Sequence, residues 1–192
     1  PTATAMSEVN TTCCARTAER PIRDVALRIG EAEDTIYIDL ANEAREVVAV
    51  STDGWNVTQD LPNNLRFKRP PEMRALPQPV YPGDISLLRD FLNVDDDDFI
   101  LCVAWLLATL RTGVPYPILT LLGEQGTAKS TTTRLLRRIV DAASPETTRP
   151  PSGDSDLFAI TANNYVLALE NISYIPPELS DSLSAIATGA GL

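Results

Sequence analysis

The chain has 192 residues, 44% of them hydrophobic, and a formal net charge of −10. This length can bury one sizeable core and a small second unit. The acidic balance makes the chain as a whole a poor non-specific ligand of nucleic acid, and the absence of histidine excludes histidine-based catalysis.

The cysteines and the apolar runs narrow the class of protein further. The three cysteines include no C-x-x-C pair, so no structural zinc site is expected and a reducing cytoplasm fits best. The longest apolar run, Phe99 to Leu110, falls short of the roughly 20 residues that cross a bilayer. A cytoplasmic protein without a membrane partner is therefore predicted.

The amino-terminal part divides into three segments. Residues 1–18 are rich in Thr, Ala and Ser without periodicity and are expected to form a disordered tail. Residues 19–70 alternate apolar and polar residues around an Asp53-Gly54 turn signal, which predicts a small antiparallel β unit. The proline-rich stretch 71–83 is read as a linker.

Two helices are expected next. Asp84 or Ser86 can cap a short helix that ends near Leu92. A second helix, from about 97 to 111, follows four aspartates, which suit a helix N-terminus better than a metal site. Because this helix is apolar on nearly every face, it is expected to be buried.

A glycine-bearing loop then lies between a strand and a helix. The apolar run 118–122 predicts a strand, and the amphipathic segment 131–140 predicts a helix. The sequence between them reads Gly-Glu-Gln-Gly-Thr-Ala-Lys-Ser, close to the P-loop pattern G-x-x-x-x-G-K-[ST]. The predicted nucleotide-binding residues are Gly123, Glu124, Gln125, Gly126, Thr127, Ala128, Lys129, Ser130 and Thr131.

Each part of this loop has a chemical reason. Gly123 and Gly126 let the backbone approach phosphate closely, and the following helix presents free N–H groups. Lys129 is placed to reach the β- and γ-phosphates of ATP, and Ser130 to ligate Mg²⁺. Ala128 stands where the pattern has its second glycine. Because this position adjoins the start of the helix, an ordinary right-handed conformation is expected to suffice there.

A partner carboxylate is expected at the end of a neighbouring strand. The apolar run 165–169 predicts a central parallel strand, and Glu170 follows it, 41 positions after Lys129. Glu170 is predicted to act on Mg²⁺ and catalysis, with Asn171 orienting a water molecule. Further helices are predicted over 154–162 and 178–187, and Arg134, Arg137 and Arg138 are read as the solvated face of the P-loop helix.

Three pieces in order resemble a known family: Gly-Glu-Gln-Gly-Thr-Ala-Lys-Ser (123–130), Leu-Ala-Leu-Glu-Asn-Ile-Ser (167–173) and the segment 179–191. They resemble the ATPase domain of phage and mobile-element primase–helicase proteins, in the superfamily 3 helicase branch of AAA+ ATPases. The resemblance implies an α/β fold over 84–192, a P-loop NTPase parallel sheet flanked by helices and incomplete at the C-terminus. It also implies DNA as a partner, a hexameric ring, and sensor and arginine-finger residues beyond Leu192.

Two other functions stay open at this point. One is a nucleotide-binding regulatory or structural module with little hydrolysis, which Asn171 in place of an acidic residue favours. The other is a P-loop kinase acting on a small molecule, against which the lack of an arginine-rich lid segment argues weakly.

Overall fold

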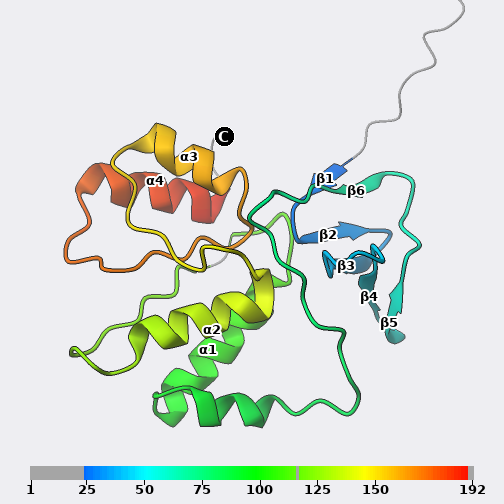
Figure 1. Ribbon diagram of the computed structural model, residues 1–192, viewed down its shortest axis with the longest axis horizontal. Coiled ribbons are helices and arrows are strands. Elements are labelled where there is room, and N and C mark those ends of the chain that lie inside the picture. Colours follow the sequence, from blue (N-terminus) through cyan, green and yellow to red (C-terminus); the bar gives the residue numbers. More distant parts are fainter. Residues whose placement is uncertain (1–23, 116, 190–192) are drawn as a thin grey trace, which may run out of the picture.

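The computed structural model describes residues 24–115 and 117–189. Its strands gather on one side, and its helices fill the other (Figure 1). A four-stranded antiparallel sheet runs in the order β2-β3-β4-β5. These strands are β2 (Ile29–Ala32), β3 (Thr35–Asp39), β4 (Val47–Ser51) and β5 (Gly54–Thr58).

A second, two-stranded sheet completes the β unit. β1 (Asp24–Ala26) pairs in parallel with β6 (Leu65–Phe67). The antiparallel prediction is confirmed for β3, β4 and β5, where alternation and the Asp53-Gly54 turn gave clear signals. β1 and β2 were not predicted, because both are short and carry no alternating pattern.

The predicted helices are confirmed within two residues at each end. They are η1 (Ile85–Phe91, a 3-10 helix), α1 (Asp96–Thr109), α2 (Lys129–Asp141), α3 (Asp154–Thr161) and α4 (Pro177–Thr188). Asp84 caps η1 through the Ser86 N–H (2.8 Å), and Asp95 caps α1 through the Asp98 N–H (2.8 Å). Asp95 as N-cap and the three aspartates in the first turn of α1 therefore act at the helix terminus, as predicted.

The main core lies where α1 packs on α2. It includes Phe99, Cys102 and Leu106 from α1, and Leu136 and Val140 from α2. The prediction that α1 is buried all round is wrong. Ile100, Leu101 and Leu107 are each more than 60% exposed, because α1 is covered on one face only among the described residues.

The parallel sheet expected around the loop is not formed as strands in the described part of the chain. Residues 118–122 are extended without ladder partners, and Leu122 is 88% exposed. Residues 165–169 make one parallel bridge, in which Leu169 faces Thr148. Thr148 N–H donates to Ala168 O (2.9 Å), and Glu170 N–H donates to Thr148 O (3.0 Å). Among the described residues, 118–122 therefore form no strand pairing, and 165–169 form this single bridge.

The first half of the proline-rich stretch, residues 72–76, is bonded through its backbone to two neighbours. Arg74 N–H donates to Ala142 O (2.8 Å) at the end of α2, and Ser144 N–H donates to Glu72 O (2.8 Å). Leu76 N–H donates to Leu40 O (2.9 Å) in the β unit. The stretch expected as a linker thus joins the β unit to α2 by backbone hydrogen bonds. The expected disordered tail, residues 1–18, lies outside the described residues.

Candidate nucleotide-binding loop

The loop before α2 depends on glycine at Gly123. This residue has φ +153°, a conformation that side chains rarely adopt. A Cβ atom built there would lie 2.9 Å from the Thr127 Oγ1 atom. Gly126 has φ +88° but faces open space. At Gly123 both the positive φ and the close Thr127 side chain favour glycine, whereas at Gly126 only the positive φ does.

Ala128 corrects one expectation from the sequence. It lies in the left-handed region, with φ +63° and ψ +16°, as the N-cap of α2. The right-handed conformation expected there is wrong, because Ala128 precedes the first helical residue, Lys129, and does not share the helical φ and ψ. An L-residue in this region is disfavoured by roughly 1–2 kcal/mol. Ala128 thus occupies a conformation that favours the glycine of the P-loop pattern.

Lys129 folds back onto the loop that precedes it. Its Nζ atom donates to Gly123 O (2.7 Å), Glu124 O (2.5 Å) and Thr127 Oγ1 (3.3 Å). Thr127 Oγ1 in turn donates to Glu124 O (2.9 Å). The ammonium group therefore lies against two loop carbonyls, where it holds the loop in a curved shape.

The backbone donors of the loop remain available for a ligand. The N–H groups of residues 124–128 donate no hydrogen bond to any group in the described parts of the chain. The first bond of α2 runs from Thr132 N–H to Ala128 O (2.9 Å). The N–H groups of Lys129, Ser130 and Thr131 therefore have no acceptor within the helix. Free N–H groups beside a positive helix end are the donor set that a phosphate requires.

The loop side chains are open to solvent. Glu124, Gln125, Ser130 and Thr131 are exposed. The Ser130 hydroxyl makes no hydrogen bond to a described residue. No group of three or more acidic or cysteine side chains could hold a metal ion in the described ranges.

Glu170 lies beside α2, the helix that begins with the loop residues Lys129, Ser130 and Thr131. Arg134 of α2 forms a half-exposed ion pair with it, at 3.2 Å between Nη2 and Oε2. Ser130 and Arg134 are four residues apart, and so lie on one face of α2, about one turn from each other. The structure therefore pairs the Glu170 carboxylate with Arg134, a residue one turn along α2 from Ser130.

Asn171 has a conformational role that the sequence did not signal. Its φ is +59°, and its side chain is exposed. Asparagine tolerates this region better than most residues. The left-handed backbone thus accounts for an asparagine at 171 without any part in catalysis, and its predicted role in orienting water stays a prediction.

The arginines of α2 do not form one solvated face. Arg138 is exposed and pairs with Glu146. Arg137 is 3% exposed, which contradicts the prediction, and it donates to Glu146 O (2.7 Å) and to Asn164 Oδ1. Burial lowers the pKa of the Arg137 guanidinium, while Asp141 and Glu146 act in the opposite direction. Arg137 therefore ties α2 to the turn after α3 and is not presented to a ligand.

Sequence reasoning missed one contact to the loop itself. Asn93, between η1 and α1, donates from Nδ2 to Thr127 O (3.4 Å). This contact links the loop to the segment that precedes α1. No local pattern marks it, because the two residues are 34 positions apart.

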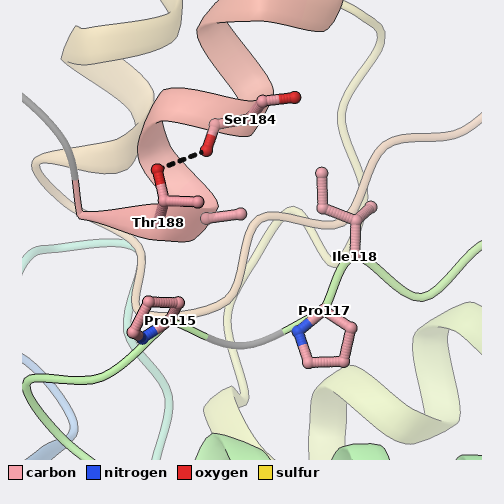
Figure 2. Close-up of a pocket in the computed structure, with 6 residues that line it drawn as sticks. Pro115, Pro117, Ile118, Ser184 and Thr188 are labelled. Carbon is pink, nitrogen blue, oxygen red and sulfur yellow. Dashed lines mark hydrogen bonds between the residues drawn. The ribbon is translucent and has the colours of Figure 1, made fainter.

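Two shallow pockets lie on the surface of the described residues, and neither is at the loop. A shallow pocket of about 350 Å³ separates Pro115, Pro117 and Ile118 from the end of α4 (Figure 2). A second, of about 480 Å³, lies between the antiparallel sheet, residues 76–79 and the outer face of α2. Neither pocket is lined by residues 123–131, and the side chains of this candidate loop are mostly exposed.

Comparison with known families places the chain. The family model of the actinomycete integrative conjugative element replication protein matches residues 85–192, more than half of the chain. The chain therefore belongs to this family of replication proteins, and its role is in replication of a mobile element. The match includes η1, the loop and Glu170, and it starts after the β unit.

Neither a curated protein nor a solved structure matches the chain. No helix in the described ranges is both long and apolar enough to cross a membrane.

Proposed function

We propose that residues 84–192 are a P-loop nucleotide-binding domain that binds ATP with Mg²⁺ and serves DNA replication of the mobile element. The observation that carries the proposal is the loop 123–130. Its backbone N–H groups are free, Gly123 and Ala128 adopt positive φ, and Lys129 lies across it at the start of α2.

The residues would act as follows. The N–H groups of 124–131 would bind the phosphates, and Lys129 would exchange its carbonyl acceptors for phosphate oxygens. Ser130 would ligate Mg²⁺, with Glu170 reaching the ion through water. Bound Mg²⁺ supplies charge neutralisation between the phosphates. Arg134 would have to release Glu170, because Arg134 and the water on Mg²⁺ would compete for the Glu170 carboxylate.

The alternative is a module that binds nucleotide without useful turnover. Two observations favour it: the Glu170 carboxylate is paired with Arg134, and Asn171 occupies a turn conformation. If the proposed domain is a helicase motor, which unwinds DNA as a ring of subunits, single-stranded DNA is expected to raise its ATP hydrolysis. Under the alternative, binding is retained and DNA has no effect on turnover.

The chain offers a matched pair of variants, because its only lysines are Lys68 and Lys129. Lys68 also donates to a carbonyl, Ala162 O (3.2 Å), but far from the loop. Lys129→Ala is expected to weaken Mg²⁺–ATP binding by about 2–3 kcal/mol, roughly 30–150-fold, because a charge-assisted contact is lost. Lys68→Ala is expected to bind as the wild type does.

Titration calorimetry measures both variants, and ATP turnover is then followed with and without single-stranded DNA. A second readout uses lysine acetylation followed by mass spectrometry, in which ATP should protect Lys129 and leave Lys68 reactive. Equal ATP affinity in the wild type and Lys129→Ala would refute the proposed site.

A further inference from the structure

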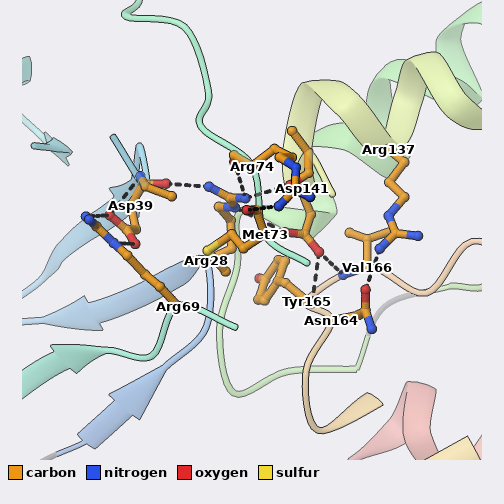
Figure 3. A network of polar contacts seen from close by, with 12 residues as sticks. Arg28, Asp39, Arg69, Met73, Arg74, Arg137, Asp141, Asn164, Tyr165 and Val166 are labelled. Atoms are coloured by element: carbon orange, nitrogen blue, oxygen red, sulfur yellow. Dashed lines mark hydrogen bonds and ion pairs between the residues drawn. The ribbon is translucent and has the colours of Figure 1, made fainter. Parts of the chain in front are cut away.

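One of the contacts between the β unit and the rest of the protein is a buried arginine. Arg28 lies between β1 and β2 and is fully buried. Its guanidinium donates from Nε to Asp141 Oδ1 (3.1 Å) and from Nη1 to Asp39 O (2.9 Å). Its Nη2 atom donates to Arg74 O (2.9 Å) and Ala142 O (3.0 Å). One side chain thus binds the β unit, the proline-rich stretch and the end of α2 (Figure 3).

Asp141 passes this contact on to the segment that ends in Glu170. Its Oδ2 atom accepts from the N–H groups of Tyr165 (2.9 Å) and Val166 (3.0 Å). Asp141 is 2% exposed. It stands at the last position of α2, where the helix dipole disfavours a negative charge. The buried Arg28 offsets that effect and completes the hydrogen bonding of the carboxylate.

The segment 165–170 is therefore held by α2 at both ends. Asp141 binds its start through two N–H groups, and Arg134 pairs with Glu170 at its end. Between these points the alternate residues Val166 and Ala168 are buried, and the Thr148 bridge fixes the backbone at 168–170. A shift of Tyr165 and Val166 would therefore be transmitted along an extended, tethered chain to Glu170.

We propose that Arg28 is a positioning residue for the nucleotide site. Acting through Asp141, it sets the place of Glu170 and so the Mg²⁺ dependence of nucleotide binding. This inference rests on the proposed function. It assigns the β unit a part in the site, although the family match begins only at residue 85.

The test compares Arg28→Lys with a matched change in a second Arg–Asp pair. Lysine keeps the charge but cannot make the four directed hydrogen bonds of the guanidinium at once. Arg69→Lys is the control, because Arg69 pairs with the side chain of the buried Asp39 (2.8 Å), whose carbonyl also accepts from Arg28. Within the described ranges Arg69 makes no hydrogen bond to α2 or to residues 165–170. ATP affinity is measured without Mg²⁺ and then over a Mg²⁺ titration, in full-length protein well below the unfolding temperature.

Arg28→Lys should raise about tenfold the Mg²⁺ concentration at which the increase in ATP affinity is half-maximal. Its ATP affinity without Mg²⁺ should stay within about twofold of the wild type. Arg69→Lys should change neither. If Arg28 only stabilises the fold, Arg28→Lys should lower the ATP affinity by the same factor with and without Mg²⁺. Hydrogen exchange of Tyr165 and Val166, followed without nucleotide, should accelerate in Arg28→Lys alone. Asp141→Asn, which replaces an acceptor by a donor, should exceed the effect of Arg28→Lys.

The outcomes separate the two proposals. If the wild type does not bind Mg²⁺–ATP, the proposed function fails and this inference fails with it. If the wild type binds and Arg28→Lys behaves as Arg69→Lys does, only this inference is overturned. If the Arg28 and Asp141 variants do not fold, NMR of the wild type decides. Mg²⁺ added to the ATP complex should shift the Arg28 Nε–H resonance and leave that of Arg69 unchanged, and an unchanged Arg28 signal overturns the inference.

Discussion

Ala128→Gly should stabilise the protein, which is unusual for a glycine placed at a helix start. Ala128 has φ +63° and ψ +16°. Because glycine adopts this left-handed conformation without strain, the substitution removes a conformational cost of roughly 1–2 kcal/mol. Glycine also gains freedom in the unfolded chain, which opposes the change by about 0.4–1 kcal/mol. The net expectation is a gain of about 0.5–1 kcal/mol in the free energy of unfolding.

Thermal and urea unfolding of the full chain measure this gain. For a protein of this size, 1 kcal/mol corresponds to a Tm shift of about 2–4 °C, so a rise of about 1–4 °C is expected. The control is Ala104→Gly, at an exposed site inside α1. There glycine should lower stability by about 1 kcal/mol. If the two variants lose stability alike, Ala128 is right-handed and the reasoning about this loop is wrong.

Two further variants test the loop and its partner carboxylate. Gly123→Ala places a Cβ 2.9 Å from Thr127 Oγ1 at φ +153° and should lower ATP affinity at least about tenfold. Gly113→Ala shares a positive φ (+67°) in open space and should retain ATP affinity in calorimetry; equal losses would mean that Gly123 acts through stability alone. Arg134→Gln frees Glu170, and because half-exposed pairs contribute about 0.2–1 kcal/mol, the Mg²⁺ needed for half-maximal ATP binding should fall by up to about fivefold. Arg138→Gln, which releases Glu146 instead, should not change it, and a rise in Arg134→Gln would show that Arg134 positions Glu170 rather than competing for it.

The buried polar contacts give this protein an internal organisation that crosses its sequence segments. Arg28 and Asp141 are 113 positions apart, and both are buried. Such a pair is costly to break, because each charge is left in a poorly solvated place. The β unit, the proline-rich stretch and α2 are therefore expected to unfold together. The expected domain boundaries at 18, 70 and 83 stay predictions.

The helix caps, the helix periodicity and the hairpin turn could be predicted from the sequence alone. Caps at Asp84 and Asp95, and the 3.6-residue period of α2, depend on neighbours a few positions away. The same holds for the turn at Asp53-Gly54. The candidate loop was found because closely spaced residues specify its chemistry, and Lys129 does begin α2 after it.

Tertiary structure decided what those residues do. The φ of Ala128 depends on how the loop enters the helix, and the burial of Arg137 on the turn at Asn164. The exposed face of α1 depends on which elements cover it, since an apolar pattern states a preference for burial but names no partner. Arg28 and Asp141 carried no local signal, because a buried ion pair is specified only when distant segments meet.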